Sequence, residues 1–365
     1  MDASVSIGTG HVMRCLTLAS ALRVKGFDCF FICCNHSGNL ISEITKRDFS
    51  VTIVPSFAKT QVNSGVKEFI VDGENEISHI NIDCLNDAIQ TANSFVGKKI
   101  DCLVVDHYGL DVYWERCMRS LCRKLVVIDD LMDREHICDL FLDQNLGRKP
   151  NGYKKFLPKG CRILLGPKYS LLRPEFIDLR TGIQIRGGSS DVRKILISMG
   201  GVDEINATSK VLRSILQASL SENINITVVM GKFAPWIDNV KAVIKNMPQH
   251  VELRVNVNNM AELMANADLA IGAAGTTSWE RCCLGLPSII CILAENQISI
   301  ASALERVGAA RIFKIDDAEA DIGQLIRELL IDSQALMVMR RVALGIVDGH
   351  GVHRVVNSIE DLLSS

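Results

Sequence analysis

Short apolar runs alternate with amphipathic stretches along most of the 365-residue chain. In the first half, apolar runs rich in β-branched and aromatic residues predict strands at 29–34, 51–55, 102–108, 124–130 and 139–145. Between them, apolar positions at helical spacing predict helices at 81–97 and 111–122. Continuous apolar strands separated by amphipathic helices are typical of a parallel sheet covered on both faces.

This alternation stops between about residue 146 and residue 190, where proline, glycine and charged residues dominate, as in a connection between domains. It then resumes, with strands predicted at 193–201, 225–231, 251–255, 267–275, 287–293 and 311–315. The pattern predicts four parts: an N-terminal domain over 1–165, a linker over 166–190, a second domain over 191–345 and a C-terminal helix over 346–365.

The predicted fold class is therefore α/β, with two Rossmann-like parallel-sheet domains facing a cleft. Ligands of open α/β sheets bind beyond the carboxyl ends of the strands. We expect the functional residues directly after strands, on the two walls of that cleft.

Composition narrows the function further. Lys and Arg number 40 against 42 acidic residues, a net charge of -2, which does not favour binding to nucleic acid or to an anionic membrane. Many of the 13 cysteines lie inside apolar runs, and none has zinc-ligand spacing. With no signal-peptide or membrane-spanning pattern, the sequence predicts a soluble cytoplasmic protein, a monomer, that uses neither metal nor cofactor.

The stretch "SIGTGHVMRC" at 6–15 places glycines directly before a predicted helix. The backbone N–H groups of that turn, including that of Gly10, favour a polarised oxygen or an anion. His11 lies in the first helical turn, where the positive end of the helix disfavours imidazolium and suits a general base. The alternative is a histidine that only caps the helix. Arg14, one turn further on, is expected to pair with Asp2 or Asp106, or to meet a phosphate.

The stretch "ADLAIGAAGTTSWERCCLGLP" at 267–287 predicts a strand, a glycine turn and a helix. Gly275, Thr276 and Thr277 form the turn, whose N–H and hydroxyl groups suit a diphosphate. Glu280 follows on the first helical turn, where a carboxylate suits a pair of ribose hydroxyls. The alternative for Glu280 is a capping box in which it accepts a hydrogen bond from a backbone N–H.

Further polar residues follow other predicted strands. Glycines end two strands of the second domain, and amide side chains follow another, which favours a nucleotide cradle and contacts to sugar hydroxyls; these residues are Gly200, Gly201, Gly231, Asn296 and Gln297.

In the first domain, Asp106 is expected to orient His11 or Arg14, and Tyr108 to donate a hydrogen bond into the cleft, unless both belong to a purely structural network at the strand end. The acidic segment 129–133 lacks a histidine or a further carboxylate that would complete a metal site, so it is interpreted as a structural loop.

Taken together, "DASVSIGTGHVMRCLTLA", "CLVVDHYGLD", "VVIDDLMDR", "LLGPKYSLLRPEF", "ISMGGVD" and "GAAGTTSWERCCLGLP" followed by "AENQ" resemble the UDP-2,4-diacetamido-2,4,6-trideoxy-β-L-altropyranose hydrolase family of pseudaminic acid biosynthesis. The resemblance implies a GT-B-like fold with UDP held by the second domain. It also implies that His11 is the catalytic base, that Glu280 binds ribose, and that Tyr108 and Asn296 face the sugar.

The family usually begins with a short strand ahead of the aspartate that is Asp2 here, so the resemblance implies either that the start of the sequence is misplaced or that the N-terminal sheet lacks its first strand. The implied reaction is attack of water on the anomeric carbon with inversion and release of UDP, the partners being a UDP-sugar and water. A glycosyltransferase using the same UDP-amino sugar, a non-catalytic nucleotide-sugar binding protein and, less favoured, a dinucleotide oxidoreductase remain as alternatives.

Overall fold

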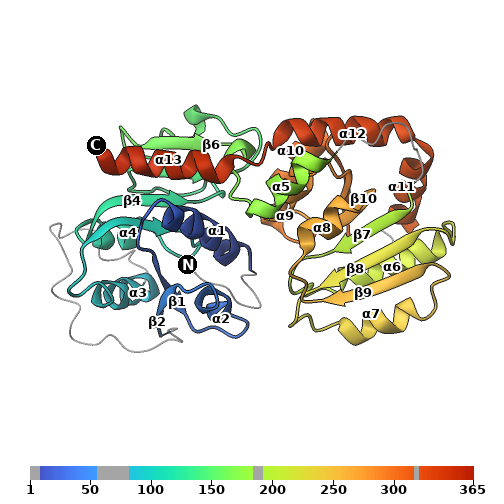
Figure 1. Cartoon of the computed structure of the whole chain (residues 1–365), viewed down its shortest axis with the longest axis horizontal. Coiled ribbons are helices and arrows are strands. Elements are labelled where there is room, and N and C mark those ends of the chain that lie inside the picture. The colour runs from blue at the N-terminus through green and yellow to red at the C-terminus, as the bar shows by residue number, and fades with distance from the viewer. Residues whose placement is uncertain (1–8, 56–81, 184–191, 316–319) are drawn as a thin grey trace. The chain divides into compact units, whose positions relative to one another are not determined.

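The computed structural model describes residues 9–55, 82–183, 192–315 and 320–365 (Figure 1). The chain divides into two compact units. Unit 1 comprises Met1–Tyr169 and Val352–Ser365, and unit 2 comprises Ser170–Gly351. Every strand pair described in either unit is parallel, as the continuous apolar runs predict.

Unit 1 carries two groups of parallel strands, a pair ordered β1-β2 and a sheet ordered β3-β4-β5-β6. Its strands are β1 (Phe30–Cys34), β2 (Ser50–Val54), β3 (Ile100–Val105), β4 (Cys122–Ile128), β5 (Leu140–Asp143) and β6 (Arg162–Leu165). Its helices are α1 (Gly10–Val24), α2 (Ile41–Thr45), α3 (Ile82–Asn93), α4 (Val112–Arg119) and α13 (Gly351–Ser364).

Local chemistry fixes the helix ends that matter for the site. Helix α1 stops where Gly26 adopts a φ of 91°, a conformation that costs glycine little. Helix α4 starts at Asp111, whose carboxylate accepts hydrogen bonds from the backbone N–H groups of Tyr113 and Trp114, each at 3.1 Å. Helix α4 therefore begins directly after the short loop that follows β3.

Among the described residues of unit 1, no strand pair joins β1 to β3. Both strands, together with α1 and the C-terminal helix, line a cavity of about 660 Å³. Most of its wall is apolar, with side chains such as Leu18, Leu22, Phe31 and Ile359. The first strand whose absence the resemblance suggests would lie ahead of Asp2. Residues 1–8 lie outside the described residues.

The C-terminal helix α13 returns to unit 1 and lies beside β6 (Figure 1). Arg162 of β6 donates a hydrogen bond to the carbonyl oxygen of Ser358 at 3.0 Å. Val355 and Ile359 are almost fully buried, at 0% and 1% exposure. Unit 1 thus contains the last residues of the sequence as well as the first 169.

Unit 2 contains one six-stranded parallel sheet ordered β12-β11-β10-β7-β8-β9. Its strands are β7 (Lys194–Ser198), β8 (Asn225–Met230), β9 (His250–Val255), β10 (Leu269–Ala273), β11 (Ser288–Ile292) and β12 (Ala310–Lys314). Its helices are α5 (Pro174–Gly182), α6 (Ala207–Gln217), α7 (Ile237–Ile244), α8 (Met260–Ala265), α9 (Thr276–Cys283), α10 (Ile298–Arg306), α11 (Ala320–Ile331) and α12 (Ser333–Ile346).

The chain order of these strands reverses direction between β7 and β10. From β7 the chain proceeds outward through β8 and β9, and it then returns to place β10 on the other side of β7. Such a reversal opens a crevice at the carboxyl ends of the two neighbouring strands, where α/β sheets bind their ligands.

The segment expected to be a linker over 166–190 contains a helix. Helix α5 begins at Pro174, directly after Arg173, and buries Phe176 completely. Proline at the first helical position is a helix-start signal, which the interpretation of this charged segment as a connection overlooked. The last part of the expected linker, 184–190, lies outside the described residues.

Candidate active site

In unit 1 the candidate residues meet at the N-terminus of α1. Gly10 is the first residue of this helix, and His11 and Arg14 follow on the same face, one turn apart. Both side chains are buried, with His11 exposed by 7% and Arg14 by 5%. Two polar side chains buried this far from water need hydrogen-bond or ion-pair partners of complementary charge.

Asp106 supplies those partners from the end of β3. Arg14 donates to both of its carboxylate oxygens, from Nε to Oδ2 and from Nη2 to Oδ1, each at 2.6 Å. His11 Nδ1 lies 2.6 Å from Oδ1 of the same carboxylate. Of the two carboxylates expected to pair with Arg14, the structure places Asp106 there, and Asp2 lies outside the described residues.

The charge on Asp106 fixes the tautomer of the histidine. Burial alone would raise the pKa of Asp106, but the charges of Arg14 and His11 and the hydrogen bonds from both hold it well below its usual range. An ionised carboxylate only accepts, so Nδ1 of His11 must carry the hydrogen in that bond. The 3.2 Å contact between Arg14 Nη2 and His11 Nδ1 joins two donors that share Asp106. In the neutral ring, Nε2 is therefore the lone-pair nitrogen.

Tyr108 packs against His11, with ring centroids 4.6 Å apart and planes at 86°. Its hydroxyl donates to Asp130 Oδ1 at 2.6 Å. Burial and the charge of Asp130 both raise the pKa of Tyr108, so the phenol stays protonated. The structure thus gives the Tyr108 hydrogen a partner inside unit 1, whereas the sequence had suggested a hydrogen bond donated into the cleft.

The acidic segment after β4 also contributes to this cluster. Asp130 Oδ2 lies 3.3 Å from Arg14 Nη1, so Asp130 contacts both Arg14 and Tyr108. Sequence reasoning assigned this segment to a structural loop. The available signal was the position of "IDD" directly after a strand adjacent to β3, where carboxyl ends converge.

Unit 2 brings its glycine turns together at one sheet edge. The strands that precede them, β10, β7 and β8, are neighbours in the sheet. A Cβ on Gly231 would lie 1.9 Å from the carbonyl oxygen of Gly201, so only glycine permits this approach of two turns. Gly200 adopts a φ of 92°, and both it and Gly201 are exposed.

Two of the helices that follow these turns, α6 and α9, differ at their N-termini. At α6, Asp203 accepts hydrogen bonds from the backbone N–H groups of Ala207 at 2.7 Å and Thr208 at 3.0 Å. At α9, the N-cap is Gly275 at a φ of 145°, and no side chain caps the helix. The chain's own carboxylate thus neutralises the N-terminus of α6, whereas that of α9 remains suited to an anionic ligand.

Thr276 and Thr277 are the first two residues of α9 and are half-buried beside Gly275. Glu280 is the fifth residue of that helix, too far along for the capping box, which requires the third. Its carboxylate lies 3.6 Å from Arg173 Nη2 and its side chain is 16% exposed. Burial raises the pKa of Glu280 to about 7, although the charges of Arg173 and Arg281 oppose the rise.

Two arginines that support this turn were missed from the sequence. Arg281 is 4% exposed and donates to the carbonyl oxygen of Ala273 at 2.8 Å and to Ser278 Oγ at 3.0 Å. Arg173 stands in the segment expected to be a linker and reaches Glu280 from there. No local spacing in the sequence signals either arginine. Arg173 contacts Glu280, which is distant in the sequence, and Arg281 makes its contacts from the buried side of its own helix.

The polar residues after β11 have separate environments. Gln297 Oε1 accepts a hydrogen bond from the backbone N–H of Leu293 at 2.9 Å, so this side chain closes its own loop. Asn296 is exposed in the same short 3₁₀ turn, Glu295–Gln297. Of the two amides, Asn296 is the one presented to solvent.

The described part of the chain comprises residues 9–55, 82–183, 192–315 and 320–365. No cluster of three or more His, Cys, Asp or Glu side chains in it could hold a metal ion. None of its helices is both long and apolar enough to cross a membrane.

The fold defines the class of this protein. Residues 184–348 match the family model described as the glycosyltransferase family 28 C-terminal domain. The crystal structure of MurG from Acinetobacter baumannii superposes with a TM-score of 0.65 at 15% identity, covering 97% of each chain. A structure of MnaA from S. aureus with UDP gives a TM-score of 0.60 at 11% identity, covering 96% of this chain and 93% of that one. The chain thus has the GT-B-like architecture of two Rossmann-like domains.

Relatives identified by sequence similarity narrow the comparison further than the fold does. The chain is 23% identical over 308 residues to the UDP-2,4-diacetamido-2,4,6-trideoxy-β-L-altropyranose hydrolase of Campylobacter jejuni, covering 84% of this chain and 95% of that protein. This finding confirms the resemblance drawn from the motifs. The chain is also 29% identical to the uncharacterized protein MJ1062 of Methanocaldococcus jannaschii, over 81% of its own length and 55% of that protein. It is 30% identical to the spore coat polysaccharide biosynthesis protein SpsG of Bacillus subtilis, over 57% of its own length and 60% of that protein.

Proposed function

We propose that this chain hydrolyses UDP-2,4-diacetamido-2,4,6-trideoxy-β-L-altropyranose to UDP and the free sugar, as a step of pseudaminic acid biosynthesis. The observation that carries the proposal is the hydrogen bond from His11 Nδ1 to the buried carboxylate of Asp106. That bond leaves Nε2 able to accept a proton. Similarity to the Campylobacter jejuni hydrolase supports the choice of substrate.

In the proposed reaction, the oxygen of a water molecule attacks the anomeric carbon while one of its protons passes to His11 Nε2. The bond between that carbon and the β-phosphate oxygen breaks, and UDP leaves with the electron pair. One displacement with one base inverts the anomeric configuration. General-base assistance of this kind contributes about 10²–10⁴ in rate.

Asp106 and Arg14 act on the base rather than on the substrate in this proposal. Asp106 holds the tautomer and stabilises the imidazolium that forms, as the carboxylate does in a catalytic triad. Arg14 keeps Asp106 ionised, since its charge lowers the pKa of that carboxyl against the effect of burial. The substrate itself contacts the backbone of Gly10 in this unit.

UDP is assigned to unit 2. The open N-terminus of α9, formed by Gly275, Thr276 and Thr277, would hold the diphosphate and stabilise the charge that develops on it. Glu280, in its ionised form, would accept hydrogen bonds from the ribose hydroxyls. Gly200, Gly201 and Gly231 would let the nucleotide approach the backbone closely, and Asn296 and Gln297 complete the polar edge.

The test is UDP release from this nucleotide sugar with no acceptor present. Hydrolysis predicts steady turnover to UDP and free sugar. The family 28 match makes a glycosyltransferase the second candidate, and that activity predicts release only when an acceptor hydroxyl is added. A non-catalytic binding protein would bind the nucleotide sugar and release nothing under either condition.

A further inference from the structure

Asp130 has no role in the reaction proposed above, yet it contacts two of the residues around the base. We infer that Asp130 is a positioning residue, which fixes the ring of His11 through Tyr108 and Arg14 and adds the negative charge that the protonated base needs. This inference rests on the proposed function of His11.

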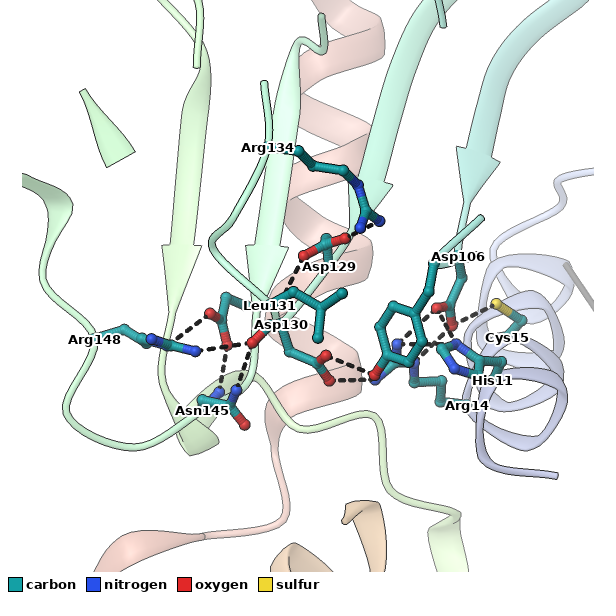
Figure 2. A network of polar contacts seen from close by, with 12 residues as sticks. His11, Arg14, Cys15, Asp106, Asp129, Asp130, Leu131, Arg134, Asn145 and Arg148 are labelled. Atoms are coloured by element: carbon teal, nitrogen blue, oxygen red, sulfur yellow. Dashed lines mark hydrogen bonds and ion pairs between the residues drawn. The ribbon is translucent and has the colours of Figure 1, made fainter. Parts of the chain in front are cut away.

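The first support is that Asp130 bonds to both neighbours of the base at once. Its Oδ1 accepts the Tyr108 hydroxyl hydrogen at 2.6 Å. Its Oδ2 lies 3.3 Å from Arg14 Nη1 (Figure 2). Tyr108 in turn packs edge-on against the His11 ring, 4.6 Å away. The imidazole is thus held by Asp106 on one side and by a tyrosine ring, whose own hydroxyl is fixed, on another.

The second support is that Asp130 is itself held in place. Its backbone carbonyl oxygen accepts hydrogen bonds from Asn145 Nδ2 at 3.0 Å and from Arg148 Nη2 at 2.8 Å. Arg148 is anchored by the buried carboxylate of Asp143, with Nε 3.0 Å from Oδ2. A flexible surface carboxylate would not need such anchoring, whereas a group that must hold others within a fraction of an ångström does.

The third support is the charge of the cluster. The charged and titratable groups around His11 are Arg14 and Cys15 on α1, Asp106 and Tyr108 after β3, and Asp130 after β4. Burial keeps the Cys15 thiol protonated, since it raises the pKa of that group. Two carboxylates and one guanidinium therefore carry a single net negative charge, which becomes zero when His11 accepts the proton. Without Asp130 the same step would leave a buried net positive charge.

The test compares four variants in the full chain by kcat, KM and the pH dependence of kcat. Asp130→Asn keeps the shape and an acceptor for Tyr108, but removes the charge and turns a donor toward Arg14. Tyr108→Phe removes only the hydroxyl, and the double variant joins the two changes. Asp133→Asn is the matched control. That carboxylate lies on the same loop, is 59% exposed, and has Arg134 as its ion-pair partner at 3.5 Å.

We expect Asp130→Asn to lower kcat about tenfold to a hundredfold with KM changed less than about twofold, since positioning errors slow the chemical step. The pH dependence of its kcat should also differ from that of the wild type, because the variant lacks one negative charge of the cluster around His11. Adding Tyr108→Phe to Asp130→Asn should cost less than Tyr108→Phe alone. The control should match the wild type.

An active wild type with an Asp130→Asn variant of unchanged kcat and unchanged pH dependence would overturn the inference while leaving the proposed function intact. A wild type that releases no UDP would instead overturn the function. The inference is then decided by ¹⁵N NMR of the histidine side chains. Movement of the His11 resonances in Asp130→Asn but not in Asp133→Asn supports positioning, and unchanged His11 resonances refute it.

Discussion

His11 and Glu280 show how burial gives ionisable side chains different tasks. At His11, a desolvated carboxylate and a desolvated guanidinium neutralise each other, and the ring is fixed by the bond that remains to Asp106. At Glu280, the compensating Arg173 is 3.6 Å away, so desolvation dominates and the carboxyl holds its proton up to near-neutral pH. The first arrangement suits a base that must keep one orientation, and the second suits a group that becomes charged when a ligand arrives.

The role of His11 gives the first prediction. His11→Asn should lower kcat by about 10²–10⁴ while the affinity for UDP, measured by calorimetry, stays within about twofold, because the proposed base is in unit 1 and the proposed UDP site is in unit 2. The matched control is His353→Asn, an exposed histidine of α13. Full activity in His11→Asn, or equal losses in both variants, would refute His11 as the base.

Glu280 gives a prediction on pH dependence. Its pKa of about 7 means that the free protein holds the proton below pH 7 and loses it above. If the carboxylate accepts hydrogen bonds from ribose, binding requires the ionised form, so affinity should rise about tenfold from pH 6 to pH 8. UDP-N-acetylglucosamine is the suitable probe, since its diphosphate diester does not titrate in this range.

Glu280→Gln should bind that probe more weakly and with no dependence on pH between 6 and 8. Glu222→Gln is the control, because this carboxylate of unit 2 is exposed and is not among the charges that shift the pKa of Glu280. It should keep the slope of the wild type. A Glu280→Gln variant with the same rise in affinity would show that another group titrates.

At the scale of elements, three neighbouring strands of unit 2 end in turns that the sequence marks with glycine. The glycines are required for different reasons. Gly231 is needed because a side chain would collide with Gly201, whereas Gly275 is needed for its φ of 145°. Close approach and unusual backbone conformation together shape one edge of the sheet.

Gly231→Ala should therefore lower UDP affinity by about tenfold or more and destabilise unit 2 by about 1–3 kcal/mol, because the turn after β8 must move away from Gly201. Gly345→Ala is the control, since a Cβ there meets no atom within 4 Å and its position is helical. Thermal unfolding and calorimetry of both variants test this. Wild-type affinity in Gly231→Ala would remove these turns from the nucleotide site.

The elements themselves were largely predictable, and the exceptions have physical causes. The apolar strands stand out because both of their faces are buried, as at β7, whose three central residues are all buried. Strand β6 was passed over because its four residues, Arg162–Leu165, lie within a segment rich in proline, glycine and charge. Helix α5 was passed over for the same reason.

The candidate site was predictable only where its residues follow a strand or a glycine. His11 and Asp106 satisfy that rule, and the contact between them is present. Glu280 lies five residues after Gly275, on the helix that this glycine precedes. Asp130 also follows a strand, but its contact with Arg14 joins segments 116 residues apart, and the contact of Arg173 with Glu280 joins segments 107 residues apart. No local pattern encodes such pairs.

At the scale of the whole molecule, the chain enters unit 1, forms unit 2 and returns to unit 1 through α13. Helix α13 buries Val355, Val356, Ile359 and Leu362, and an ion pair of 3.2 Å joins its Glu360 to Lys25 of the segment that follows α1. Unit 1 is therefore assembled from both ends of the sequence, whereas unit 2 is one continuous segment.

Truncation after Gly351 should accordingly destabilise unit 1 by about 5 kcal/mol or more, since four buried apolar side chains are lost, and leave unit 2 able to bind UDP. Calorimetric unfolding should show one transition lowered or absent and the other unchanged. Glu360→Gln is the control and should cost less than about 1 kcal/mol, because its ion pair is exposed. Loss of UDP binding on truncation would contradict the division of labour between the units.

The central claim is that water attacks the anomeric carbon, and isotope transfer tests it most directly. The full chain is incubated with the UDP-2,4-diacetamido-2,4,6-trideoxy sugar in H₂¹⁸O without acceptor, and the released UDP is analysed by mass spectrometry while NMR follows the first-formed anomer. The account predicts unlabelled UDP and a sugar of inverted configuration. Labelled UDP would show attack on phosphorus, and a retained anomer would require a covalent intermediate; either result would contradict the account.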